Sequence, residues 1–379
     1  MSNPILVVIF LRGGTDGLSL IAPAGDRNYT AARSVKLRVP RKGEDAGHVL
    51  RNANADADFR FHGRAKGLSE LYGAGELAVI HASGLKDGTR SHFDAEDRME
   101  RAAPGAGSST GGWLGRWLKA AKPEGILPAL AVGPAAPDSL AGATDIVVAR
   151  EIEAMRALPG HPHRKGVLAA LGLLSGDPSF GPTMTRLFSL SDSIEARVAL
   201  DRNGELKPYQ PRTAYPEDNE LASGLRTIAR AIKLDLGLRV ASVDFGGWDT
   251  HVDQAYEFPR LVEKLSTAMM AFWKDLGPLQ ERVTVVTMSE FGRRLKSNES
   301  GGTDHGHGNA MMVLGGAVKG GRMFGTWPGL ENDALDLGAD LAITTDYRDV
   351  LADVMEGHMG ISDHAALFPG FTRTSLGLV

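Results

Sequence analysis

One short loop of this 379-residue chain concentrates side chains that can bind metals. Asp304, His305 and His307 stand within four residues, among small and flexible neighbours, and Glu290 precedes them directly after an apolar run. Carboxylate and imidazole ligands together suit zinc, manganese or iron. Polar residues also gather in loops simply because loops face water. So dense a group nevertheless favours a site for a divalent metal, with these four residues as candidate ligands.

Two further candidate ligands follow another apolar run. Residues 239–245 predict a strand, and the segment after it contains Asp249 and His251 beside a tryptophan. In open α/β sheets, ligands bind at the carboxyl ends of the strands. Asp249 and His251 are therefore predicted to be metal ligands.

The first strand is expected at residues 5–11, where seven consecutive apolar residues suit a central parallel strand covered by helices on both faces. Asp16 follows it in a glycine-containing segment, so the same rule predicts a metal carboxylate there. The alternative is a structural turn that Asp16 stabilises. The glycines of this segment lack the spacings of a phosphate-binding loop.

A hydroxyl group stands at a predicted helix start. After the strand expected at residues 77–81, Ser91 fits a helix N-cap, with Asp94 three positions later. A serine at that place also has the geometry of a nucleophile favoured by the helix dipole. Capping alone and nucleophilic catalysis are both compatible with this pattern.

These strands predict an α/β fold with a mainly parallel sheet, helices on both faces and the first strand in the centre. We expect a single α/β hydrolase-like domain over residues 1–379, with a mostly helical insertion at about 150–237. Because the carboxyl ends of parallel strands share one rim, the candidate ligands and Ser91 are expected to converge there.

Composition excludes several classes of protein. Hydrophobic residues make up 42% of the chain, which is enough for a full core, and the absence of cysteine rules out disulfides and thiolate ligands. The net charge of −4 argues against a nucleic-acid partner. The run at 5–11 is too short to cross a membrane and has no leader signature. We expect a cytoplasmic protein as written, or a periplasmic one if an export leader precedes residue 1.

The chemistry most natural to such a rim is hydrolysis or transfer of a phosphate or sulfate ester, because bound metal polarises an ester oxygen and activates a hydroxyl or water. The substrate would be a small-molecule or glycan ester. The alternative is a degenerate, non-catalytic member of the fold that binds a ligand, a glycan or a protein partner. Retention of many titratable groups on one rim argues for chemistry.

Five ordered motifs resemble those of a bacterial family known as domain of unknown function 1501, many of whose members carry a twin-arginine export leader. The motifs are FLRGGTDGL, TRSHFDAEDRME, GGWDTH, TMSEFGRR and GTDHGHGN. That family in turn resembles a distant branch of the alkaline phosphatase and sulfatase superfamily. The resemblance implies an alkaline phosphatase-like fold with a nucleophile at a helix start and metal-binding Asp and His residues.

Position by position, the resemblance implies the following roles: Ser91 as nucleophile, Asp16 as first-strand carboxylate, Asp249 with His251 as one metal cluster, and His305 or His307 as the late histidine. Two features depart from the superfamily. Glu290 and Phe291 stand where Asp and His are usual, and Asp249 and His251 are two positions apart instead of four. Either a second metal is lost or the site is rebuilt.

Overall fold

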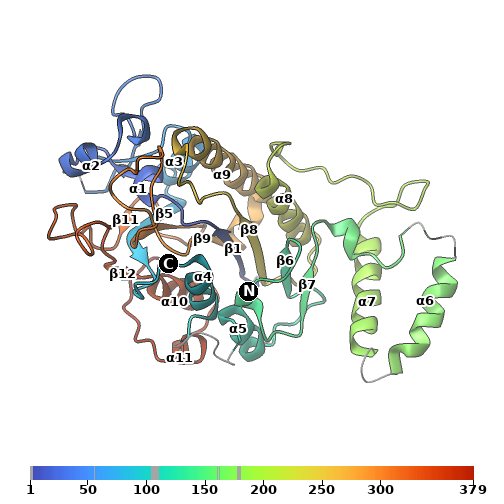
Figure 1. Ribbon diagram of the computed structural model, residues 1–379. Coiled ribbons are helices and arrows are strands. Elements are labelled where there is room, and N and C mark those ends of the chain that lie inside the picture. Colours follow the sequence, from blue (N-terminus) through green and yellow to red (C-terminus); the bar gives the residue numbers. More distant parts are fainter. Residues whose placement is uncertain (1–2, 55, 104–110, 160, 162, 177–180) are drawn as a thin grey trace.

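Strand β1 (Ile5–Leu11) lies inside a nine-stranded sheet in the computed structural model, which describes residues 3–54, 56–103, 111–159, 161, 163–176 and 181–379 (Figure 1). It pairs in parallel with β8 (Val240–Phe245) on one side and β9 (Val283–Met288) on the other. The predicted α/β class, with a mainly parallel sheet and a central first strand, is confirmed.

The order of strands in the large sheet is β11-β5-β10-β9-β1-β8-β6-β7, and β12 pairs with β5. Its remaining members are β5 (Leu77–Gly84), β6 (Ala129–Val132), β7 (Ile146–Val148), β10 (Asn309–Gly315), β11 (Met323–Phe324) and β12 (Thr345–Asp346). A separate three-stranded sheet contains β2 (Ile21–Pro23), β3 (His48–Val49) and β4 (Phe59–Phe61).

Helices cover both faces of the large sheet because β1 is apolar on both sides. The odd-numbered residues of β1 pack in a core with α3 (Lys66–Gly73), α8 (Glu220–Lys233) and α9 (Gln254–Leu276). Its even-numbered residues pack in a second core with α4, α5, α10 and α11. The bounds of these four helices are His92–Arg101, Trp113–Ala121, Tyr347–Gly357 and His364–Leu367. The short helices α1 (Gly17–Leu20) and α2 (Arg27–Ala32) follow β1 and β2.

Strand β10 runs antiparallel to both β9 and β5, and so departs from the parallel pattern. It is joined to β9 by the loop 289–308 and not by a crossover helix, which a parallel neighbour would require. The loop therefore stays at the carboxyl end of β9, where the segments after β1, β5 and β8 also lie. This rim carries most of the candidate residues.

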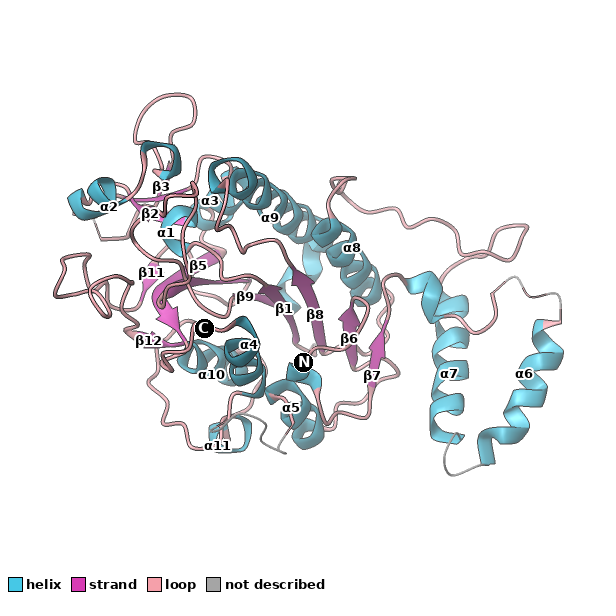
Figure 2. Cartoon of the chain, in the orientation of Figure 1, coloured by secondary structure: helices cyan, strands magenta, loops and turns pink. Residues whose placement is uncertain are grey.

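Described elements between residues 150 and 237 are helical, and they include α6 (Arg164–Gly172), α7 (Gly181–Arg197) and α8. In Figure 2, α6 and α7 lie beyond β7 and away from the sheet, whereas α8 packs on the sheet and on α9. No helix within the described ranges is both long and apolar enough to span a membrane.

Candidate metal centre

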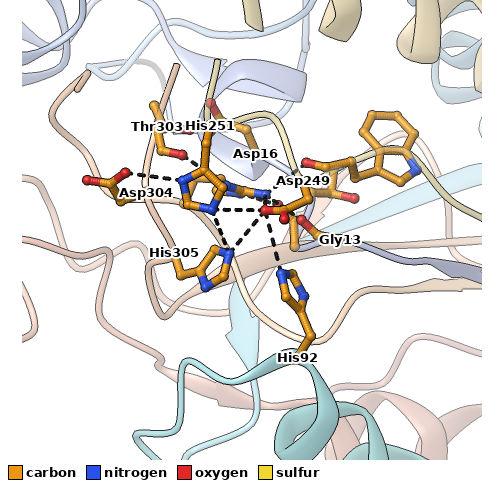
Figure 3. Close-up of polar contacts among 12 residues, drawn as sticks. Gly13, Asp16, His92, Asp249, His251, Thr303, Asp304 and His305 are labelled. Atoms are coloured by element: carbon orange, nitrogen blue, oxygen red, sulfur yellow. Dashed lines mark hydrogen bonds and ion pairs between the residues drawn. The ribbon is translucent and has the colours of Figure 1, made fainter. Parts of the chain in front are cut away.

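Three imidazole rings converge on one carboxylate oxygen at the rim of the sheet (Figure 3). The Nε2 atoms of His251 and His305 each lie 3.0 Å from Asp249 Oδ1, and the Nε2 atom of His92 lies 3.5 Å from it. The two Nε2 atoms of His251 and His305 are 2.9 Å apart. The rings come from the segment after β8, from the loop before β10 and from the first position of α4.

Oxygen atoms hold the opposite nitrogens of two of these rings. His305 Nδ1 lies 2.9 Å from the carbonyl oxygen of Arg90, which can only accept, so Nδ1 carries the hydrogen. His251 Nδ1 lies 3.2 Å from Asp304 Oδ1. A hydrogen bond from Asn298 lowers the pKa of Asp304, so this carboxylate also accepts. With the proton on Nδ1, each neutral ring has a lone pair on Nε2.

His92 is held by Glu290, at the end of β9. Glu290 Oε1 lies 2.6 Å from His92 Nδ1 and accepts a second hydrogen bond from the Gly13 backbone at 2.8 Å. Although burial raises the pKa of Glu290, the hydrogen bonds from His92 and from backbone N–H groups lower it further than burial raises it. The bond to Glu290 in turn raises the pKa of His92. Among the described residues, the buried His92 Nε2 has no hydrogen-bond partner.

The donor atoms fit a divalent metal. Lone pairs of His251 and His305 face each other and the Asp249 carboxylate, an arrangement that is repulsive unless a proton or a metal ion lies between them. Two atoms bound to one zinc at about 2.0–2.1 Å can be at most about 4.2 Å apart. The Nε2 atoms of His92 and His305 lie 3.5 and 3.0 Å from Asp249 Oδ1, and the donor atoms of these three residues all lie within 4.8 Å of one another. Imidazoles fixed through Nδ1 are typical of metal sites. Nitrogen with one carboxylate oxygen suits zinc, manganese or iron.

Arg293, which was not predicted from the sequence, connects the segments that carry the candidate ligands. Its side chain is fully buried, and its Nη2 donates to Asp249 Oδ1 at 2.6 Å. Its other acceptors are the backbone oxygens of Gly13, Gly14, Trp248 and Thr303. Partial burial raises the pKa of Asp249, but the contacts with His305 and Arg293 outweigh burial and lower the pKa to about 2. Asp249 is therefore a carboxylate at physiological pH.

Asp16 does not join this cluster. It is fully buried, and both of its oxygens bind the guanidinium of Arg33, at 2.5 and 2.9 Å. Ser19 and Gln254 donate two further hydrogen bonds, and Asp16 caps α1. This geometry matches the structural turn that the sequence left as the alternative, because a buried ion pair and two further donors saturate the carboxylate.

His307 also lies outside the cluster. Its Nε2 is 3.2 Å from the carbonyl oxygen of Leu85, and its Nδ1 is 3.1 Å from Asp336 Oδ2. Glu290 contacts the cluster through His92, and the ligand atoms of His92, Glu96 and Glu290 lie within 4.8 Å of one another. Of the seven predicted ligands, the structure thus gathers Asp249, His251, Asp304 and His305 around one point, with Asp304 in contact through His251.

Ser91 occupies the N-cap position of α4. Its exposed Oγ accepts from the Asp94 backbone at 3.5 Å, the limit of a hydrogen bond. The next residue, His92, is a candidate ligand that was not predicted from the sequence. One signal was available: His92, Glu96 and Glu100 repeat at intervals of four, so one stripe of the predicted helix is titratable.

The motifs that contribute these ligands match a known family. The match covers residues 78–370, and the family is described as "Protein of unknown function (DUF1501)". The chain belongs to this family. No curated protein matches its sequence.

Several solved structures resemble this DUF1501 chain. The C-terminal periplasmic domain of EcEptC from Escherichia coli, in a complex with Zn, has 7% identity and a TM-score of 0.37, covering 83% of this chain and 74% of that one. The lipoteichoic acid synthase LtaP from Listeria monocytogenes has 9% identity and a TM-score of 0.40, covering 95% and 72%. An alkaline phosphatase from the Antarctic bacterium TAB5 has 10% identity and a TM-score of 0.33, covering 83% and 93%.

Arg12, at the end of β1, anchors α4 in this DUF1501 protein. Its guanidinium lies 3.0 Å from Glu96, 2.5 Å from Glu100 and 2.9 Å from Asp244. Glu96 and Glu100 are one helical turn apart, so the three-way contact fixes α4 over the sheet and aims His92 at Asp249. Burial raises the pKa of Glu96 to about 7, although Arg12 opposes this shift.

Proposed function

We propose that this protein is a metal-dependent hydrolase or transferase that acts on a phosphate or sulfate ester. The observation that supports it most is the convergence of three imidazole Nε2 atoms on Asp249 Oδ1, with each Nδ1 already bound to an oxygen. His92, His251, His305 and Asp249 would hold the metal. Bound there, a divalent ion polarises an ester oxygen and lowers the pKa of a hydroxyl or water.

The donor atoms of the site are open to a substrate, and buried charged residues hold them in place. The side chains of Asp249 and His251 are partly exposed, so a substrate can reach the donor atoms from solvent. Glu290 and Arg293 lie behind them and are fully buried. The buried residues hold the ligands in place before a substrate arrives, which reduces reorganisation during the reaction.

Ser91 is the proposed nucleophile, with Thr89 as the second choice. Its Oγ stands exposed at the start of α4, where backbone N–H groups and the helix dipole favour an anion. In the proposed step, Oγ forms a bond to phosphorus or sulfur and releases its proton to water. The ester P–O or S–O bond breaks, and the departing oxygen takes up a proton from water. A second water then cleaves the seryl ester and restores the hydroxyl.

Metal content is the first test of this function. Protein purified without chelator is expected to contain about one equivalent of a divalent metal. The variants His92→Ala, Asp249→Asn and His305→Ala are each expected to lose it, whereas the surface variant His161→Ala keeps it. Metal-free wild-type protein that neither takes up nor is stabilised by added zinc, manganese or iron contradicts the proposal.

Turnover is the second test. The metal-loaded protein is expected to cleave at least one member of a panel of aryl phosphates, phosphate diesters and sulfates, and a chelator should abolish this. Metal binding without cleavage of any ester would support the alternative, a site that holds a ligand and does not transform it.

A further inference from the structure

The rim of the candidate metal centre is rich in exposed carboxylates. Side chains of Asp244, Asp249 and Asp304 are 49%, 48% and 50% exposed, and Glu96 is 25% exposed. These four residues, which we call the carboxylate rim, come from the end of β8, the segment after it, the loop 289–308 and α4. A substrate that approaches the imidazoles from solvent therefore passes a negatively charged surface.

Two arginines at this rim, Arg12 and Arg90, are already bound by carboxylates, whereas Arg294 is about half exposed and lies 3.8 Å from Asp340. Arg12 contacts Asp244, Glu96 and the buried Glu100, so its single positive charge is outnumbered. Arg90 is likewise shared between two carboxylates, Asp336 and Asp340. These contacts occupy the guanidinium groups that would otherwise be the natural partners of a phosphate.

The centre itself has no surplus of positive charge. Asp249, Glu290 and Asp304 hold or flank the three imidazoles, and Arg293 is the cation that touches Asp249. Arg293 together with one divalent ion balances these three carboxylates. Arg12 brings three carboxylates with it, and at pH 8 these include an ionised Glu96, whose pKa is about 7. Arg294, whose charge acts on Asp304, offsets one of these negative charges. The site is therefore negative at pH 8, and repulsion from a negative site grows with the charge of the substrate.

We infer that the site selects esters that carry a single negative charge, namely sulfate monoesters or phosphate diesters, over phosphate monoester dianions. This inference rests on the proposed ester hydrolysis. A sulfate monoester and a phosphate diester present the same charge and the same type of tetrahedral centre. Comparing activity on an aryl sulfate with activity on a diaryl phosphate shows which of these two esters the site prefers.

The first experiment compares metal-loaded wild-type protein on an aryl phosphate, a diaryl phosphate and an aryl sulfate at pH 8. The phosphate monoester is then a dianion, because its second pKa is about 6. For at least one singly charged ester, kcat/KM is expected to exceed that for the monoester by about tenfold or more. Higher ionic strength should raise kcat/KM for the monoester most steeply, since salt screens repulsion. A preference for the monoester overturns the inference and leaves the proposed function standing, whereas cleavage of no ester overturns both.

The second experiment removes one charge from the rim. Asp244→Asn is expected to raise the ratio of monoester to diester activity on the order of threefold, as loss of one nearby charge in a solvated site predicts. The matched control is Asp235→Asn, at the opposite end of β8, where the residue adopts a positive φ of 49° that asparagine tolerates. The metal content of Asp244→Asn is measured as well. If it equals that of wild type, Arg12, Glu96 and Glu100 still hold α4 and His92 in place. An unchanged ratio in Asp244→Asn overturns the inference that charge sets the preference.

Discussion

Glu290 and His92 are separated by 198 positions in the sequence, yet Glu290 Oε1 and His92 Nδ1 lie 2.6 Å apart. The contact joins the end of β9 to the start of α4. It turns Nε2 of His92 toward Asp249 and leaves Glu290 behind the imidazole, where it orients the ring. Carboxylate, histidine and metal in this order form a common arrangement in which the carboxylate strengthens the imidazole as a ligand.

Replacement Glu290→Gln should weaken metal binding about tenfold, because an amide can accept the hydrogen bond from His92 but has no charge to support it. The measurement is a competition titration with a chelator of known affinity, together with a thermal melt to check the fold. Glu299→Gln, an exposed change in the same loop, is the control. Equal affinity in Glu290→Gln and wild type would contradict the role of Glu290.

Arg293→Met should lower the free energy of unfolding by about 3 kcal/mol or more, because it leaves Asp249 and four backbone oxygens, three of them in buried hydrogen bonds, without their shared donor. Urea denaturation of the metal-free protein measures this. The neighbouring Arg294 is about half exposed, so Arg294→Met should change stability by less than about 0.5 kcal/mol. Similar losses of stability in both variants would show that Arg293 is not the residue that holds these segments together.

Ser91→Ala separates capping from catalysis. Loss of the weak cap contact should reduce stability by about 0.5–1 kcal/mol. If Ser91 is the nucleophile, turnover of the best ester should fall by about a hundredfold or more while metal content is unchanged. The control is Ser34→Ala, since Ser34 precedes a short helix without a side-chain cap bond. Full turnover in Ser91→Ala would transfer the proposed role to Thr89 or to water.

Burial of His81, in β5, should make the free energy of unfolding depend on pH. Its Nε2 donates to the Ile21 carbonyl oxygen, and its Nδ1 accepts from the Ala82 backbone, each at 2.9 Å. This buried ring must be neutral, and burial lowers its pKa to about 4. The unfolded chain, with a pKa near 6.5, binds the proton more readily between these values. The contribution of His81 is therefore complete above pH 6.5 and falls by about 3 kcal/mol as pH decreases to 4.

Urea denaturation at pH 7.5 and 4.5 tests the effect of His81. Its replacement by asparagine should reduce the loss of stability between these pH values, although the variant is less stable at pH 7.5. His161→Ala, at an exposed position, should leave the loss unchanged. The same pH dependence in His81→Asn and wild type would exclude His81 as its source.

The sequence by itself determined the central position of β1 in the sheet and part of the candidate metal centre. Seven apolar residues in β1 can be buried only if helices cover both faces, which makes the strand central. Asp304 and His305 were identified because metal-binding side chains are dense in one loop, and Asp249 and His251 because they follow a strand. Their proximity was predicted because the carboxyl ends of parallel strands share one rim.

Only the tertiary structure decided which groups face one another. Asp16 follows a strand end as Asp249 does, but Arg33 saturates its carboxylate and removes it from the site. The spacing of His92, Glu96 and Glu100 marks a titratable stripe on a helix but does not say what the stripe faces. In the structure, Glu290 at the end of β9 orients the His92 ring. Such long-range pairing depends on how α4 packs on the sheet, and periodicity along the chain carries no information about that packing.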